Sequence, residues 1–85
     1  MAHVRIYTTT YCGYCTAAKR YLKEVKGVTF EEIDAAAPEI RQWLRTASGQ
    51  TTVPQIFIGE RSIGGYTDMR ALDAAGELDG LLSAP

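Results

Sequence analysis

The stretch Tyr11-Cys12-Gly13-Tyr14-Cys15 holds both cysteines of the chain, and the fold is organised around it. An alternating run of apolar and polar residues, residues 3–7, precedes it and is typical of a β-strand. Residues 16–25 follow it and predict a helix. The C-x-x-C motif therefore lies where a strand passes into a helix N-terminus, a context typical of thiol redox chemistry.

The spacing of the two cysteines predicts a division of labour between them. Residues i and i+3 share one face of a helix, so Cys12 and Cys15 are close enough to form a disulfide. Unpaired N–H groups of the first turn and the helix dipole favour negative charge at Cys12. Because the thiolate is the reactive form, Cys12 is predicted to be the nucleophile and Cys15 the resolving thiol.

Three other interpretations of the two cysteines are weaker. Two buried structural cysteines are less compatible with the strand-to-helix context. A zinc site needs about four ligands, whereas the chain offers two cysteines and His3, so no metal site is expected in the monomer. A structural disulfide closing so short a loop would restrain little of the unfolded chain.

The composition predicts a single small globular domain spanning residues 1–85. Nine basic and ten acidic residues give a net charge of −1, which does not indicate a nucleic-acid or anionic-membrane surface. No apolar run approaches the length of a membrane span, and no signal-peptide pattern is visible at the N-terminus. A cytoplasmic location is therefore expected.

The order of elements predicts an α/β fold, β-α-β-α-β-β-α. Strands are expected at residues 3–7, 28–33, 53–58 and 61–63, and the main helices at residues 13–26, from Pro38 to Gly49, and from Thr67. A helix joins the first two strands, which predicts parallel pairing, whereas Gly59-Glu60 predicts a hairpin between the last two. A four-stranded mixed sheet with helices on both faces follows, and a third strand beside the first would bring Val53-Pro54 near Cys12.

The periodicity of the helices also predicts which side chains are buried. An apolar stripe on the first helix consists of Ala18, Leu22 and Val25. The basic residues of that helix are expected to face solvent; they are Lys19, Arg20, Lys23 and Lys26. Trp43 is expected in the core, and Thr67 is expected to cap the third main helix.

Three motifs together resemble the glutaredoxin family, and in particular its short bacterial dithiol members. They are Tyr11-Cys12-Gly13-Tyr14-Cys15, residues 52–58 (Thr-Val-Pro-Gln-Ile-Phe-Ile) and residues 63–68 (Ile-Gly-Gly-Tyr-Thr-Asp). The resemblance covers nearly the whole chain and implies a thioredoxin-like fold.

The resemblance also implies a glutathione-binding site. Pro54 would be a cis-proline that leaves the backbone groups of Val53 free for glutathione. Thr67 and Asp68 would hold the γ-glutamyl end at a helix N-terminus, while Arg41 would face the glycyl carboxylate. The full predicted set is Tyr14, Arg41, Thr52, Val53, Pro54, Gly65, Thr67 and Asp68.

The function implied is that of a glutathione-dependent thiol–disulfide oxidoreductase in cell redox homeostasis. Cys12 would attack protein–glutathione mixed disulfides and protein disulfides, with glutathione as co-substrate and a monomeric chain as the working form. Two alternatives remain open: a dimer bridged by a [2Fe–2S] cluster through Cys12 and glutathione, and a mycoredoxin that uses another small thiol. The chain has Thr9 where many members of the family carry a lysine, so one positive charge near Cys12 is missing.

Overall fold

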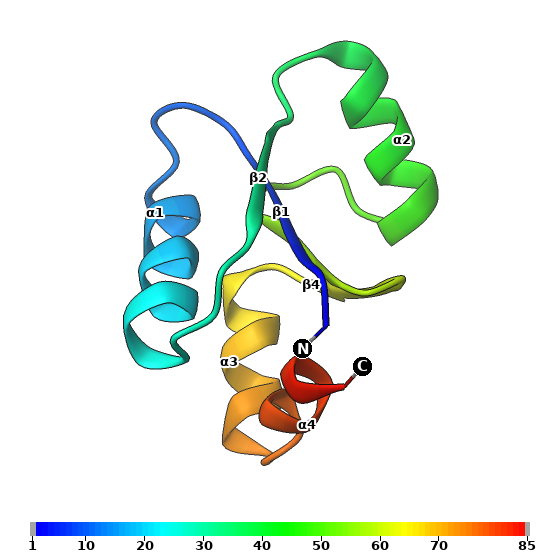
Figure 1. Ribbon diagram of the computed structural model, residues 1–85. Helices are drawn as coiled ribbons and strands as arrows, with labels where there is room; N and C mark the ends of the chain where they lie inside the picture. The colour runs from blue at the N-terminus through cyan, green and yellow to red at the C-terminus, as the bar shows by residue number, and fades with distance from the viewer. Residues whose placement is uncertain (1, 85) are drawn as a thin grey trace.

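The computed structural model describes residues 2–84 and contains one mixed sheet flanked by helices (Figure 1). In chain order the elements are β1 (Val4–Thr8), α1 (Gly13–Arg20), the π-helix η1 (Tyr21–Val25), β2 (Glu31–Asp34), α2 (Pro38–Ser48), β3 (Gln55–Ile58), β4 (Arg61–Gly64), α3 (Tyr66–Ala74) and α4 (Leu78–Ser83).

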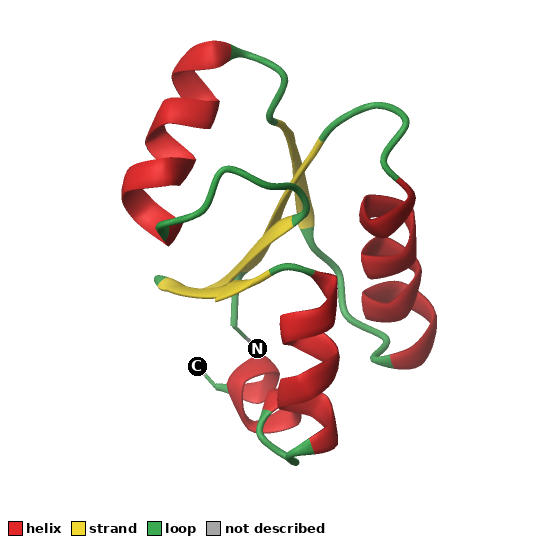
Figure 2. Cartoon of the chain, turned by 180° about the vertical axis from the view of Figure 1, so that it is seen from behind, coloured by secondary structure: helices red, strands yellow, loops and turns green. Residues whose placement is uncertain are grey.

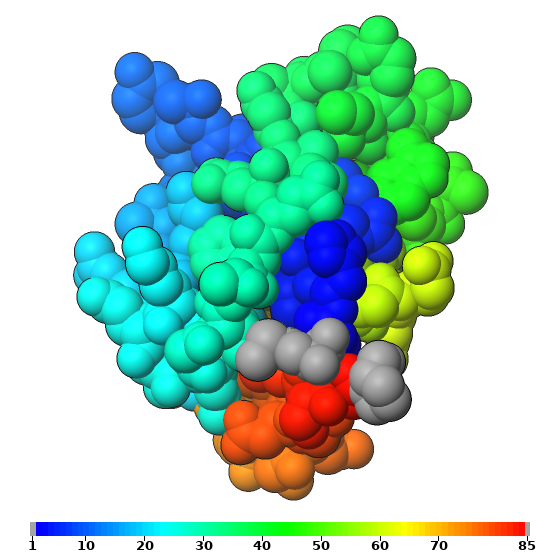
Figure 3. Space-filling model, viewed as in Figure 1, coloured from blue at the N-terminus to red at the C-terminus, as the bar shows by residue number. Residues whose placement is uncertain are grey.

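The sheet has the strand order β2-β1-β3-β4, so β1 and β3 are its central strands. β1 is parallel to β2 and antiparallel to β3, and β3 and β4 form an antiparallel hairpin. The space-filling view shows β1, in dark blue, between β2 and the hairpin (Figure 3). The predicted topology is confirmed, including the pairing of β1 with β3 that local pattern alone did not prove.

The two faces of the sheet carry separate apolar clusters, because alternate residues of each strand point to opposite faces. On one face, Ile6 and Ile56 pack with residues of η1, α3 and α4, including Leu22, Met69 and Leu78. On the other face the cluster consists of Tyr7, Ala35, Leu44 and Phe57. Helices therefore cover both faces, with α2 opposite α1 and α3 (Figure 2).

The predicted first helix changes its geometry near its end. After Arg20 the chain continues as the π-helix η1, in which Lys26 N–H donates to the Tyr21 carbonyl at 3.1 Å. The wider turn alters the rotation of the following residues, so Leu22 is buried but Val25 is 61% exposed. The prediction that Val25 belongs to the apolar stripe is wrong for this reason.

Lys26 is also wrongly predicted to face solvent. Its ammonium group contacts the carboxylates of Asp73 at 2.6 Å and Asp79 at 2.9 Å, and only 14% of its side chain is exposed. Hydrogen bonds to these two carboxylates raise the pKa of Lys26 above its ordinary value. The ion pairs fasten the end of η1 to α3 and α4.

Three other local predictions need correction. β2 begins at Glu31 and not at residue 28, and the backbone N–H of Val28 bonds instead to the Leu22 carbonyl at 3.0 Å. Gly65, and not Thr67, is the N-cap of α3. Trp43 is 44% exposed, with its ring 5.4 Å from that of Tyr7, so it borders the core and is not enclosed by it.

Candidate active site

Cys12 and Cys15 lie at the first turn of α1, and both are free thiols in the structure. Cys12 is the N-cap residue, and its sulfur accepts a hydrogen bond from the backbone N–H of Cys15 at 3.1 Å. An N–H group of the first turn thus points directly at the Cys12 sulfur. Cys12 is partly exposed, whereas Cys15 is 1% exposed, so only Cys12 presents its sulfur toward solvent.

Burial determines the protonation state of the Cys15 thiol. Loss of solvation, reinforced by a hydrogen bond with Cys12, raises the pKa of Cys15 to about 11. A backbone hydrogen bond from Thr9 and the charge of Lys19 act in the opposite direction on the same thiol. At neutral pH Cys15 is therefore a protonated thiol, which suits a group that reacts after Cys12.

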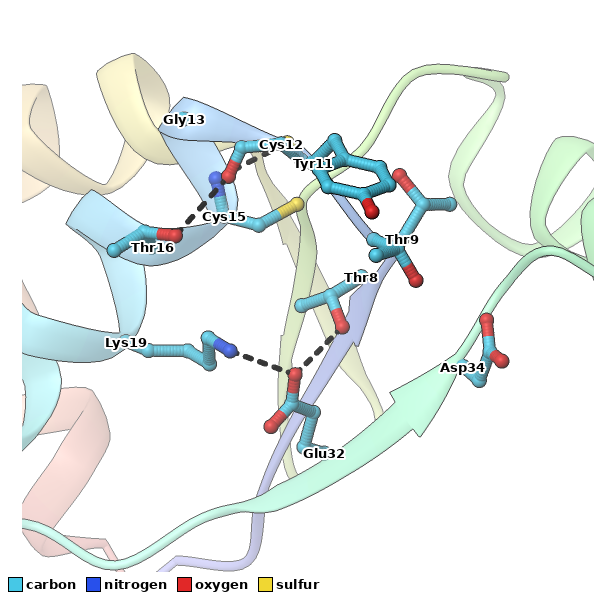
Figure 4. Close-up of a pocket in the computed structure, with 11 residues that line it drawn as sticks. Thr8, Thr9, Tyr11, Cys12, Gly13, Cys15, Thr16, Lys19, Glu32 and Asp34 are labelled. Carbon is cyan, nitrogen blue, oxygen red and sulfur yellow. Dashed lines mark hydrogen bonds and ion pairs between the residues drawn. The ribbon is translucent and has the colours of Figure 1, made fainter.

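A pocket of about 720 Å³ opens beside the two cysteines (Figure 4). At its base Glu32 accepts hydrogen bonds from the Thr8 hydroxyl at 2.8 Å and from the Lys19 ammonium at 2.9 Å. These bonds lower the pKa of Glu32, the bond from Lys19 contributing most. The sequence did not predict this cluster, because its members come from β1, α1 and β2.

The loop before β3 also contacts Cys12, although its residues do not line the pocket. The Val53–Pro54 peptide bond is cis, in keeping with the family resemblance. The Cys12 thiol donates a weak hydrogen bond to the Val53 carbonyl at 3.8 Å, so Val53 directly faces the nucleophile. Thr52 is exposed and accepts a hydrogen bond from the Gln55 amide at 3.4 Å.

The N-terminus of α3 is built from two glycines and Asp68. The Asp68 carboxylate accepts a hydrogen bond from the Gly65 N–H at 2.9 Å, which closes the first turn. Gly64 has a φ of +94°, and a Cβ there would overlap the Asp68 carboxylate. A Cβ on Gly65 would lie 3.3 Å from the Pro54 carbonyl oxygen, so this glycine lets α3 approach the cis-proline loop. Thr67 follows in the same turn and is exposed.

Arg41 is exposed on α2 and is held in place by two backbone carbonyls. Its Nε donates to Ala35 at 3.1 Å and its Nη1 donates to Thr51 at 3.3 Å. A guanidinium carries five N–H donors, so further donors remain available to a carboxylate. The contacts connect the start of α2 with the loop that leads to Val53.

Tyr14 and Tyr66 form an aromatic pair between α1 and α3. Their ring centroids are 6.1 Å apart, and Tyr14 is 64% exposed. Arg70 donates to the Tyr66 hydroxyl at 2.8 Å and lies 4.5 Å from the Tyr21 ring. Arg70 of α3 therefore contacts Tyr66 of this pair as well as Tyr21. No sequence pattern indicated these contacts.

The predicted site residues come from four separate parts of the fold: the start of α1, the helix α2, the loop before β3 and the start of α3. Val53 lies against Cys12, and Gly65 lies against Pro54. Arg41 contacts the same loop through Thr51. Sequence reasoning missed Gln55, which holds that loop from within the core, and the Thr8–Glu32–Lys19 cluster. The signal that could have pointed to Gln55 is a polar residue within an otherwise apolar strand.

Neither a membrane span nor a ready metal site is found in the described part of the chain. None of the helices within residues 2–84 has the length and apolar character of a membrane-spanning segment. Over the same residues, no three or more His, Cys, Asp and Glu side chains gather where they could hold a metal ion.

Comparison with known proteins places the chain in one family. The family model described as Glutaredoxin matches residues 4–63. A glutaredoxin of Pseudomonas aeruginosa is 53% identical over 85 residues, which cover 99% of this chain and 100% of that protein.

Two solved structures extend the likeness to three dimensions. One, a complex of buckwheat glutaredoxin with glutathione, has a TM-score of 0.86 at 29% identity, covering 96% of this chain and 77% of that one. Another, described as metal binding of glutaredoxins, has a TM-score of 0.76 at 48% identity, covering 99% and 91%. The chain belongs to the glutaredoxin family.

Proposed function

We propose that this protein reduces protein–glutathione mixed disulfides and protein disulfides, with glutathione as the reductant. Thiol–disulfide oxidoreductase chemistry follows from membership of the glutaredoxin family. The observation that most supports the finer proposal is the position of Val53, whose carbonyl faces Cys12 at 3.8 Å beside the cis-proline. An extended peptide such as glutathione would pair with the backbone there.

In the first reaction, the Cys12 thiolate attacks the glutathione sulfur of a mixed disulfide. A bond forms between Cys12 and glutathione, the original S–S bond breaks, and the protein leaves as a thiolate that takes a proton from water. The thiolate of a second glutathione then attacks the bound glutathione sulfur, which releases glutathione disulfide and restores the Cys12 thiolate. Cys15 has no part in this route.

Protein disulfides require Cys15. Cys12 attacks one sulfur of the substrate and forms a mixed disulfide with it. Cys15 loses its proton and attacks the Cys12 sulfur, so that a Cys12–Cys15 disulfide forms and the substrate leaves fully reduced. Two glutathione molecules then reduce that disulfide and are oxidised to glutathione disulfide. The buried, protonated state of Cys15 keeps it from competing with Cys12 for the substrate.

The proposed glutathione site uses the residues predicted from the family resemblance. Asp68 and Thr67 would bind the γ-glutamyl group at the N-terminus of α3, and Arg41 would bind the glycyl carboxylate. Thr52 and Val53 would hold the cysteinyl part, and the Tyr14–Tyr66 pair would line the groove.

The test is a coupled assay with glutathione, NADPH and glutathione reductase on a small glutathione mixed disulfide. Cys12→Ser should abolish activity on every disulfide, whereas Cys15→Ser should retain most activity on the mixed disulfide and lose it on a protein disulfide. Equal losses from the two substitutions on the mixed disulfide would contradict the assigned roles. Activity with mycothiol and none with glutathione would favour the mycoredoxin alternative.

Binding of a [2Fe–2S] cluster is a competing proposal, for which one chain alone supplies too few thiolate ligands. Such clusters take four thiolate ligands, and here Cys12 is the accessible thiol while Cys15 is enclosed in the core. Two chains, each with Cys12 and one glutathione, would supply the ligand set. A cytoplasmic location and a monomeric working form stay predictions from the sequence.

A further inference from the structure

Gln55 is an unusual residue for a fully buried position. Among residues 2–84, only Thr8 and Gln55 are buried polar side chains, and Gln55 is completely inaccessible to solvent. It is the first residue of β3, directly after Pro54, and pairs with Tyr7 in the central strand β1. Its backbone is therefore held rigidly by the sheet.

The carboxamide of Gln55 connects this rigid strand to the loop that precedes it. Its Nε2 donates to the Gln50 side-chain oxygen at 2.8 Å and to the Thr52 hydroxyl at 3.4 Å. The other end of the loop is tied to α2, since Ser48 exchanges hydrogen bonds with the backbone of Gln50 at 3.1 and 3.2 Å. Residues 50–53 are thus held between α2 and β3.

The side-chain oxygen of Gln55, unlike its Nε2, makes no hydrogen bond within the described residues. This oxygen, Oε1, is also buried. Turning the amide over would leave Nε2 in that unpartnered place instead. A buried polar atom without a partner lowers stability, and an apolar side chain of the same length would avoid that loss. The contribution of a glutamine here therefore lies in the hydrogen bonds that its Nε2 makes to the loop.

The loop that Gln55 holds carries the groups nearest the nucleophile. Val53 faces Cys12 through its carbonyl, and Thr52 is a direct partner of Gln55. We propose that Gln55 is a positioning residue that fixes the backbone of Thr52 and Val53 relative to Cys12 for glutathione binding. This inference rests on the proposed use of glutathione at the same loop.

The test separates positioning from ordinary core packing, because the two roles predict different results for stability. Gln55→Met keeps the length of the side chain and removes the unpartnered oxygen, so its unfolding midpoint should equal or exceed that of the wild type. Its KM for glutathione should rise about three- to tenfold, the effect expected for one or two lost hydrogen bonds. The kcat, and the rate with dithiothreitol as reductant, should change less than twofold.

Gln50→Ala is the second variant, since Gln50 is exposed and its replacement removes one partner of the Gln55 Nε2 without changing any core side chain. It should raise the KM for glutathione in the same direction, by a smaller factor. Gln42→Ala, at an exposed position on α2, is the matched control and should leave every measured value unchanged.

Three results would overturn the inference. In the first, Gln55→Met and Gln50→Ala both keep the wild-type KM. In the second, Gln55→Met loses stability together with its activity toward both reductants, while Gln50→Ala has no effect. In the third, the KM rises equally with Gln42→Ala. A wild-type protein that does not use glutathione would instead refute the proposed function, so the two failures are distinguishable.

Discussion

The thiol of Cys15 should be almost unreactive at neutral pH, even when Cys12 is absent. Its side chain is 1% exposed, and burial is the largest cause that raises its pKa, from 9.0 to about 11. At pH 7 a pKa of 11 leaves about one Cys15 in ten thousand as thiolate, compared with about one in a hundred for a pKa of 9.0. In the wild-type protein, reaction of Cys15 with an alkylating agent should therefore be slower than that of a free thiol by about a hundredfold, and steric shielding adds to this factor. Without Cys12 the factor should be smaller, because the hydrogen bond with Cys12 contributes part of the pKa shift.

The measurement is the rate of iodoacetamide alkylation of the Cys12→Ser variant between pH 6 and pH 11, followed by mass spectrometry. This substitution alters the hydrogen bond with Cys12 but not the burial of Cys15, so the midpoint of reactivity should remain clearly above pH 9. The Cys15→Ser variant reports Cys12 alone, as the control for reagent access at the same turn. A Cys15 midpoint at or below pH 9, in a folded variant, would refute the conclusion that burial controls this thiol.

Three further predictions concern stability, binding and assembly. Because Cys15 has a higher pKa folded than unfolded, the free energy of unfolding of the reduced protein should be unaffected by this group below about pH 9. It should then fall by up to about 3 kcal/mol toward pH 11, and urea unfolding of Cys15→Ala should lack that fall. Asp68→Asn keeps the acceptor for the helix cap and removes the charge, so it should raise the KM for glutathione without loss of stability. Asp68→Ala should raise this KM and should also lower the free energy of unfolding by about 1 kcal/mol. Arg41→Met should likewise raise the KM for glutathione. An unchanged KM for glutathione in all three variants would argue against the proposed glutathione site. Anaerobic reconstitution with iron, sulfide and glutathione should give a coloured dimer if the cluster proposal holds, and Gly13→Pro should suppress it, whereas a colourless monomer would exclude it.

The sequence alone was sufficient for the elements whose cause is local. Alternation in residues 3–7 and a glycine at position 49 predicted β1 and the end of α2, and Gly49 indeed has a left-handed φ of +75°. The C-x-x-C motif at the start of a helix predicted that N–H groups of the first turn would point toward Cys12, and Cys12 is indeed the N-cap residue of α1. Each of these features depends on residues that are close together in the chain, so neighbouring side chains and backbone sterics decide them.

The family motifs predicted features of the structure that local sequence patterns did not. The pairing of β3 with β1 and the cis peptide bond before Pro54 agree with the resemblance. Neither follows from periodicity, because strand pairing joins segments about fifty residues apart. The roles assigned to Arg41 and Asp68 stay predictions, although both side chains are held by backbone contacts beside the cis-proline loop.

The tertiary structure alone decided the contacts between distant polar side chains. Glu32 meets Lys19 and Thr8 because β2, α1 and β1 converge there. Lys26 is enclosed by carboxylates of α3 and α4 because a π turn precedes it, and helical periodicity assumes that no such turn occurs. A side chain's sequence neighbours limit the direction in which it points, but the packing of elements determines which distant group it meets and how far it is removed from water.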